Sequence, residues 1–238
     1  MSRVSPPNAE CRKAIADIAR RIVACEKCAR LRRYCEAVAR EKKRAYRDEV
    51  YWGRPVPGFG DPDARLLIVG LAPAAHGGNR TGRVFTGDSS GAFLMRALHA
   101  AGFASIPTSD RRDDGLVLTD VYIAAAARCA PPDNKPRPAE IGRCLPYLAA
   151  EIRALARLRV VVPLGRIAFD ACLTVLGEHG ADVSPKPAFG HGAVALLGPG
   201  QPVLIASYHP SRQNTNTGRL TPVLFDGVFA EARRRLSA

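Results

Sequence analysis

The chain has 238 residues, of which 47% are hydrophobic and 24% are charged. A chain of this length and composition can bury a sizeable core, so disorder is excluded as its main state. We expect residues 1–238 to form a single domain. Lys and Arg total 35 against 22 Asp and Glu, which gives a formal net charge of +13. A positive field of this size attracts polyanions, so nucleic acid is the first partner to test.

The positive charge is concentrated near the N-terminus. More than half of the net charge lies between Cys11 and Arg54, inside a basic helical part that we place at residues 1–60. Genomic base bias also produces an Arg- and Ala-rich composition, but it would spread the charge more evenly. The basic segment from Arg30 to Arg54 is expected to follow DNA phosphates. For Arg40 to Arg47, a solvated helix face is an equal alternative.

Short apolar runs alternate with helical patterns along the chain, which indicates a three-layer α/β/α sandwich around a central, mostly parallel sheet. The predicted strands are 65–70, 117–124, 159–164 and 203–206. The predicted helices are 8–24, 90–101, 138–158, 166–176 and 221–236. Sites in such sheets form beyond the carboxyl ends of the strands, so the residues after Val69, Ala126 and Ala206 are the candidates.

The cysteines indicate a metal site rather than disulfides. No apolar run reaches the about 18 residues of a membrane span, and the first ten residues lack a signal-peptide pattern. We therefore expect a soluble, cytoplasmic protein, in which thiols are metal ligands or small buried side chains. A C-x2-C pair is followed by two distant cysteines, and four such ligands suit zinc or an iron–sulfur cluster. These are Cys25, Cys28, Cys129 and Cys144.

Other cysteines lack a partner at ligand spacing. They are Cys11, Cys35 and Cys172, and Cys172 has apolar neighbours on a predicted helix, so we expect it in the core. Burial in the core is also the alternative for Cys129 and Cys144.

A glycine-rich loop follows the first predicted strand. Residues 70–88 read GLAPAAHGGNRTGRVFTGD, and small residues of this kind let the backbone approach a ligand closely. The loop is not a phosphate-binding P-loop, because the Gly-x4-Gly-Lys-Ser/Thr pattern is absent. Asp88 is either a helix N-cap, a catalytic carboxylate or both. Phe85 is an aromatic residue in a polar loop, where it can stack on a base.

A second polar loop follows the last predicted strand. A His at a strand end can stabilise a developing anion, although a lone His is more often structural; here it is His209. We expect the residues after it to hold phosphates, and the segment up to Arg219 to enter the minor groove. These DNA-binding candidates are Ser211, Arg212, Gln213 and Asn214.

Together, the glycine-rich loop, the segment CAPPDNKPRP from Cys129 and the segment HPSRQNTNTG from His209 resemble the motifs of family 5 (type B) uracil-DNA glycosylases. The similarity runs from about Cys25 to the C-terminus. It implies a three-layer α/β fold, a structural [4Fe–4S] cluster and hydrolysis of the N-glycosidic bond of uracil in double-stranded DNA. It also implies removal of other deaminated bases such as hypoxanthine, in the cytoplasm of a bacterium or archaeon.

The resemblance assigns roles to individual residues. Cys25, Cys28, Cys129 and Cys144 match the cluster ligands and favour iron–sulfur over zinc. Asp88 matches the carboxylate implicated in chemistry, Asn134 a polar residue of the middle motif and His209 the base-contacting histidine, and these three are our candidates for catalysis. Phe85 matches the aromatic residue that stacks on the flipped uracil. Further base contacts are expected from the first loop, at Gly70, Ala72, Ala74, Ala75, His76 and Asn79.

One departure from the wider superfamily concerns the general base. Where other members have a water-activating Asp or Glu after the first strand, this chain has Ala72, a substitution that the type B family shares. Asp88 is the nearest acidic residue, as base, as electrostatic stabiliser or only as cap. The three motifs contain no Lys except Lys135, so we expect a monofunctional glycosylase that leaves an abasic site. A monomer is the default expectation.

Two other functions compete with this one. The first is a non-catalytic iron–sulfur protein that binds nucleic acid or senses redox state, which would not need Asp88, Asn134 and His209 together. The second is a nucleotide- or tRNA-modifying enzyme on the same sheet topology. The zinc-deaminase signature is absent, which counts against deamination.

Overall fold

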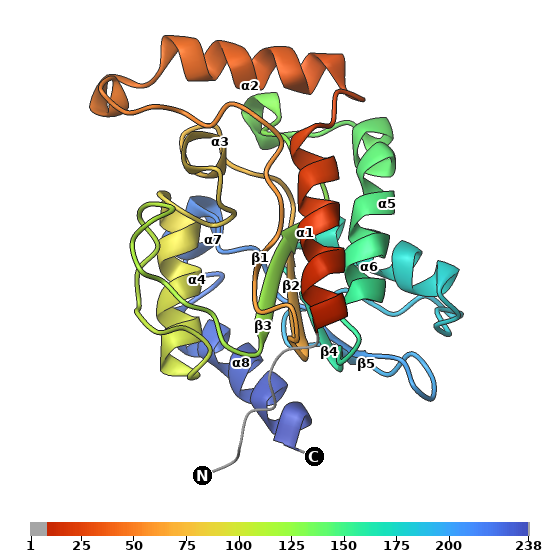
Figure 1. Cartoon of the computed structure of the whole chain (residues 1–238). Helices are drawn as coiled ribbons and strands as arrows, with labels where there is room; N and C mark the ends of the chain where they lie inside the picture. The colour runs from red at the N-terminus through yellow and green to blue at the C-terminus, as the bar shows by residue number, and fades with distance from the viewer. Residues whose placement is uncertain (1–8, 238) are drawn as a thin grey trace.

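The computed structural model describes residues 9–237. Within them lies one six-stranded sheet in the order β1-β3-β2-β4-β6-β5, covered by helices on both faces (Figure 1). The strands are β1 (Phe59–Gly60), β2 (Leu66–Gly70), β3 (Val121–Ala125), β4 (Val160–Pro163), β5 (Val194–Ala195) and β6 (Val203–Ile205). The four central strands are parallel and the two edge strands antiparallel. The predicted three-layer sandwich is confirmed.

The helices and 3-10 turns precede, connect and follow these strands. They are α1 (Ala9–Val23), α2 (Ala29–Glu41), η1 (Arg44–Tyr46), α3 (Gly78–Thr81), α4 (Ser89–Ala100), η2 (Pro132–Asn134), α5 (Pro138–Ala154), α6 (Arg166–Glu178), α7 (Arg212–Asn216) and α8 (Pro222–Ser237). Every helix predicted by periodicity is present, with ends shifted by a few residues. Position 8, where the first helix was predicted to begin, lies outside the described residues. None of the described helices is both long and apolar enough to cross a bilayer.

The sheet buries both of its faces because alternate residues of each central strand point to opposite sides. Leu66 and Ile68 of β2 pack with α4 and α8, whereas Leu67 and Val69 pack with α5 and α6. Cys172 is fully buried in the second of these clusters, which confirms its predicted place in the core.

The predicted strand at 117–124 begins four residues late. Val117 is 59% exposed, and Asp120 has a φ of +61°, which no regular strand accepts. The Asp120 carboxylate instead receives hydrogen bonds from the backbone and guanidinium of Arg65, with Arg65 Nη2 at 2.5 Å. This ion pair fixes the start of β3 beside the start of β2, so the two strand ends that carry the site are in register.

Three further elements, β1, β5 and α2, were not predicted as such from the sequence. The edge strands β1 and β5 have two residues each, too few to produce an alternating pattern. Helix α2 lies inside the basic segment and crosses one end of the molecule (Figure 1). It is fastened to the start of α5, because Arg30 donates to both carboxylate oxygens of Glu140, at 2.8 and 2.7 Å.

Candidate active site

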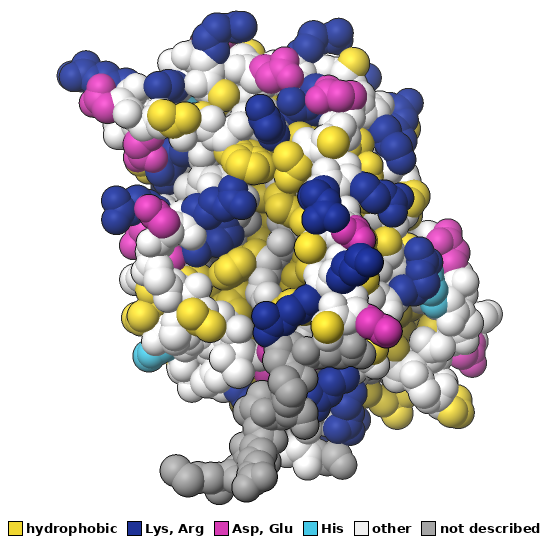
Figure 2. Space-filling view, viewed as in Figure 1, with side chains coloured by type: hydrophobic (Ala, Val, Ile, Leu, Met, Phe, Trp, Pro, Cys, Tyr) yellow, Lys and Arg dark blue, Asp and Glu magenta, His cyan; other side chains and the backbone are white. Residues whose placement is uncertain are grey.

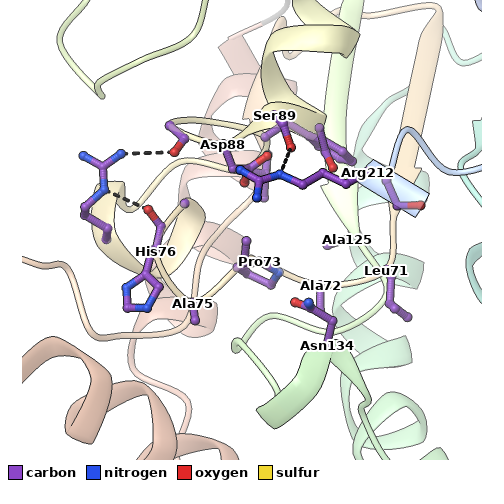
Figure 3. Close-up of a pocket in the computed structure, with 18 of the residues that line it drawn as sticks. Leu71, Ala72, Pro73, Ala75, His76, Asp88, Ser89, Ala125, Asn134 and Arg212 are labelled. Atoms are coloured by element: carbon purple, nitrogen blue, oxygen red, sulfur yellow. Dashed lines mark hydrogen bonds between the residues drawn. The ribbon is translucent and has the colours of Figure 1, made fainter. Parts of the chain in front are cut away.

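A cavity of about 1270 Å³ lies at the carboxyl ends of the parallel strands. The loops after β2, β3 and β6 all contribute to its lining. In Figure 3, Asp88, Ser89 and Arg212 lie on one side of the cavity, with Ala72 and Asn134 on the other. The three loops that the sequence singled out therefore meet in one place, at the edge where parallel sheets place their sites.

The loop after β2 supplies small side chains to this cavity. Its lining residues include Ala72, Ala74, Ala75 and His76. Gly70 does not line the cavity, but a Cβ at this position would stand 2.7 Å from the ring of Phe85. Gly70 therefore acts by leaving space for Phe85 rather than by touching a ligand.

Asn79 does not take the predicted place. It is fully buried, is absent from the cavity wall, and donates through Nδ2 to the carbonyl of Cys35 at 3.2 Å. The prediction that Asn79 contacts the substrate is corrected: its side chain fastens α3 to α2. A polar residue in a glycine-rich loop gave no sign of which side of the loop it would face.

Asp88 is both the N-cap of α4 and part of the cavity wall. Its Oδ1 accepts a hydrogen bond from the amide of Gly91 at 2.9 Å, which confirms the predicted cap. Its Oδ2 lies directly over Gly77, where a Cβ would stand only 2.1 Å away. One carboxylate oxygen therefore caps α4, and the other packs against the backbone of the loop after β2.

Opposing influences act on the Asp88 carboxyl. Burial raises the pKa of Asp88 above its usual value, because a dry site disfavours the charged form. The amides of Gly91 and Ser90 and the guanidinium groups of Arg80 and Arg212 lower it. The two arginines therefore favour the ionised form in a site that otherwise opposes it.

Phe85 and His209 are neighbours in the cavity. Their ring centroids are 6.1 Å apart and their planes are tilted by 31°. Phe85 has a φ of +49°, and the turn is so tight that a Cβ on Gly91 would stand 2.3 Å from the Phe85 carbonyl. Backbone strain of this kind is concentrated at functional sites. The turn places an aromatic ring beside the histidine.

His209 is neutral at physiological pH. Burial lowers its pKa to about 4, because the charged imidazolium is disfavoured away from water. Its Cβ lies 3.3 Å from the position that a Cβ on Gly165 would take, so the loop before α6 packs closely behind it. A neutral imidazole can donate one hydrogen bond to a ligand without carrying charge.

The residues after His209 divide into two groups. Ser211, Arg212 and Gln213 line the cavity, whereas Asn214 does not. The Nδ2 of Asn214 donates to the carbonyl of His209 at 2.8 Å, so Asn214 shapes the loop. Arg212 donates to Ser89 Oγ at 3.2 Å, which links the last loop to the start of α4 (Figure 3).

Asn134 reaches the cavity from the loop after β3. It ends the turn η2 with a φ of +56°, and Asp133 before it has a φ of +54°. Two consecutive left-handed residues bend the chain sharply, and both line the cavity. Lys135, the next residue, is exposed and outside the cavity wall.

The basic segment also forms part of the wall, which sequence reasoning missed. Its contributions are Tyr34, Lys43, Tyr46 and Glu49. On the face seen in Figure 2, Lys and Arg side chains gather at the end where α2 lies and continue down over α1. Tyrosines interleaved with basic residues were the available signal, because aromatic rings among positive charges are typical of nucleic-acid contacts.

The four predicted ligand cysteines gather at the end of the molecule below α2. Cys28, Cys129 and Cys144 are close enough to interact electrostatically, and Cys25 pairs with Tyr147, one turn after Cys144 on α5. Cys35 is a fifth thiol here: it hydrogen-bonds to Cys129, and this bond and burial raise the pKa of Cys129. Among the residues described, however, no group of three donors is arranged to hold a metal ion.

The chemistry of these residues fits a thiolate-ligated cluster. The donor set is all sulfur, which suits iron–sulfur groups. Burial raises the pKa of Cys144 to about 11, although the nearby Arg128 lowers it. Three cations stand beside three thiols, each lowering the pKa of its neighbour: Arg143 beside Cys28, Arg32 beside Cys129 and Arg128 beside Cys144.

A comparison with protein families decides the relationship. The model described as "Uracil DNA glycosylase superfamily" matches residues 57–233. The chain belongs to this superfamily. Within it, the chain is 54% identical over 213 residues to the type-5 uracil-DNA glycosylase of Thermus thermophilus, which covers 90% of this chain and 94% of that protein. The predicted resemblance to family 5 is confirmed.

Other relatives in the superfamily agree. The type-5 uracil-DNA glycosylase of Mycobacterium tuberculosis is 50% identical over 222 residues, covering 93% of this chain and 81% of that protein. The type-4 uracil-DNA glycosylase of Archaeoglobus fulgidus is 31% identical over 207 residues, covering 84% and 82% respectively. The superfamily match runs from just before β1 into α8 and leaves α1 and α2 outside, although the type-5 relatives match over most of the chain.

Proposed function

We propose that the chain hydrolyses the N-glycosidic bond of uracil in double-stranded DNA and leaves an abasic site. One observation carries this proposal: a carboxylate, Asp88, and a neutral histidine, His209, line a single cavity with Phe85 in a member of this superfamily. The relatives from Mycobacterium tuberculosis and Thermus thermophilus are named type-5 uracil-DNA glycosylases.

Recognition begins with a base removed from the helix. A base within a duplex cannot reach the cavity, so the nucleotide must flip out, at a cost that is lowest for a mispaired base such as uracil opposite guanine. Phe85 offers a ring face for stacking. Asn134 and His209 offer hydrogen-bond donors for the uracil oxygens from the other two loops.

Bond cleavage separates charge between sugar and base. The sugar gains oxocarbenium character while the leaving uracil becomes anionic. A neutral His209 donates to a uracil oxygen and stabilises that anion without first losing a proton. Asp88 stabilises the positive sugar or orients the attacking water. Ala72, at the position of the general base in other superfamily members, has no carboxylate with which to do either.

The product is an intact strand with an abasic site. Strand cleavage by a glycosylase requires an amine that forms a Schiff base with the sugar. Lys135 is outside the cavity wall, but Lys43 of the basic segment lines it. We propose that Lys43 contacts phosphate rather than sugar, so that borohydride traps no covalent adduct.

DNA binding is assigned to two surfaces. Ser211, Arg212 and Gln213, which line the cavity, contact the DNA beside the flipped nucleotide, and the basic segment follows the phosphates. Binding through several Lys and Arg side chains falls steeply with salt. The protein acts as a monomer on chromosomal DNA, in the cytoplasm of a bacterium or archaeon, and also accepts other deaminated bases such as hypoxanthine.

A structural [4Fe–4S] cluster is proposed at Cys25, Cys28, Cys129 and Cys144. When bound, the cluster supplies a cross-link and no step of the reaction. It would join the connection between α1 and α2, which contains Cys25 and Cys28, to Cys129 in the loop after β3 and to Cys144 on α5. The basic segment, which lacks a large apolar core of its own, is thereby held over the cavity.

The test is release of free uracil from a labelled duplex with one U·G pair, followed by alkali. We expect strand breaks only after alkali and no borohydride adduct. A matched duplex with T·G is the control, and duplexes with hypoxanthine and single-stranded uracil measure breadth. Salt-sensitive DNA binding without uracil release by cluster-loaded protein would overturn the proposal and favour a non-catalytic DNA-binding protein.

A further inference from the structure

Arg80 is a buried cation beside Asp88 that the proposed chemistry does not use. It is 5% exposed and extends from α3. Its Nε donates to the carbonyl of His76 at 2.8 Å, and its Nη2 donates to the carbonyl of Gly87 at 3.2 Å. His76 and Gly87 directly precede Gly77 and Asp88, so one guanidinium fastens the two chain segments on which these residues lie.

These two segments are the ones that hold the Asp88 carboxylate. Oδ2 of Asp88 is packed over Gly77, so a shift of either segment would change the position of that oxygen. The segment that contains Asp88 also packs tightly, since a Cβ on Gly87 would stand 2.2 Å from Nη2 of Arg80. The guanidinium therefore fills the space beside the turn that leads into Asp88.

The basic segment holds Arg80 from the other side. Glu49 accepts a hydrogen bond from Nη1, and the guanidinium carbon lies 4.0 Å from the centroid of the Tyr46 ring. The backbone amide of Trp52 donates to the Arg80 carbonyl at 2.9 Å. Tyr46 and Glu49 are themselves lining residues of the cavity.

We infer that Arg80 is a positioning residue: it clamps the segments around Gly77 and Asp88, and Tyr46 and Glu49 of the basic segment keep the clamp in place. The inference rests on the proposed role of the Asp88 carboxylate in the reaction. It assigns to the basic segment a part in shaping the site, in addition to its positive charge.

The sign of the electrostatic effect follows from the groups that face Asp88. Arg80 and Arg212 lower its pKa, and burial raises it. Asp110 and the neutral His209 also line the cavity. Arg80→Met removes a cation, which raises the pKa of Asp88 and moves the acid limb of the pH–rate profile to higher pH. Glu49→Gln removes an anion, which lowers the pKa of Asp88 and moves the acid limb of the pH–rate profile to lower pH.

The experiment measures uracil release in single turnover between pH 5 and 9 with cluster-loaded protein. We expect Arg80→Met to lower the rate constant at least about tenfold, since small misplacement of a reacting group is costly. Affinity for a duplex with a non-cleavable uracil analogue should stay within about threefold, because Arg80 is not exposed to phosphates. Arg80→Lys keeps the positive charge but not the guanidinium hydrogen bonds. We expect it to have the acid limb of the wild type but a lower rate constant.

Arg96→Met is the matched control. Arg96 of α4 pairs with Asp226 of α8 and does not line the cavity, so its loss should leave both the rate constant and the acid limb unchanged. In parallel, the carboxyl ¹³C shift of Asp88 is titrated by NMR in wild type and in Arg80→Met, which requires no activity.

Two results would overturn the inference. One is a wild-type pH limb and rate in Arg80→Met. The other is a lower rate with an unmoved limb and an unmoved Asp88 titration, which would mean that Arg80 only supports the fold. If the wild type and Arg96→Met release no uracil, the proposed function fails instead, and the Asp88 titration alone decides whether the clamp exists.

Discussion

The cavity has two kinds of wall, and they differ in how their side chains are placed. The loops after β2, β3 and β6 begin at the ends of buried parallel strands, so the sheet itself brings Ala72, Asn134 and His209 together. The basic segment has no strand to place it. It is held through buried side chains that interact across the fold, such as Arg80 with Glu49 and Asn79 with Cys35.

This difference explains which parts of the site the sequence predicted. Apolar strands followed by polar or glycine-rich loops are a local pattern, and the topology of parallel sheets converts it into a location. The place of Tyr46 or Glu49 depends on an arginine about thirty residues away, which no local pattern encodes. The predicted substrate contact of Asn79 was wrong for the same reason, because the sequence of the loop does not indicate which of its side chains face α2.

The fold itself was predictable to a similar degree. The four central strands and the helices between them follow from apolar periodicity, since burial requires it. The start of β3 was misplaced because the Arg65–Asp120 pair, rather than apolar content, decides where pairing begins. The short edge strands and the turns α3 and η2 depend on left-handed residues and tertiary contacts, which periodicity does not report.

The largest expected loss of activity is at Asp88, in the loop after β2. Asp88→Asn keeps an N-cap, since Asn caps helices as well as Asp does, but removes the charge. We expect single-turnover uracil release to fall on the order of a thousandfold with little loss of thermal stability. Asp226→Asn, which removes a carboxylate outside the cavity, should retain the wild-type rate. Equal rates for Asp88→Asn and wild type would reduce Asp88 to a cap.

His209→Ala should cost less, about a hundredfold in rate, because it removes one donor to the leaving base. With a pKa of about 4, His209 is neutral throughout the range from pH 5.5 to 8. The wild-type profile should therefore show no inflection from His209 in that range. An inflection near pH 6.5 that disappears in His209→Ala would show that the charged form takes part.

Gly77→Ala tests how the loop after β2 holds the Asp88 carboxylate. The new Cβ would stand 2.1 Å from Asp88 Oδ2, so the carboxylate must move. We expect about a tenfold loss of rate with unchanged DNA affinity, measured on the non-cleavable duplex. Gly142→Ala on α5 meets nothing within 4 Å and should leave activity unchanged. An unimpaired Gly77→Ala would mean that the position of Oδ2 is unimportant.

The smallest loss of activity is expected at Asn79, which is buried outside the cavity wall. Asn79→Ala loses one hydrogen bond to the Cys35 carbonyl and should lower the free energy of unfolding by about 1 kcal/mol. Uracil release by the folded variant should stay near the wild-type rate, because Asn79 does not line the cavity. Denaturant titration and single-turnover kinetics separate the two. A large rate loss at wild-type stability would return Asn79 to the site.

The most direct test of the central claim is a crystal structure of the cluster-loaded protein with a duplex that carries 2′-fluoro-deoxyuridine opposite guanine. The fluorine disfavours the oxocarbenium character of the sugar and so preserves the substrate. We predict a flipped uracil stacked on Phe85, with its oxygens facing Asn134 and His209 and its sugar facing Asp88. A uracil that remains paired in the helix, or a base bound outside this cavity, would contradict the account.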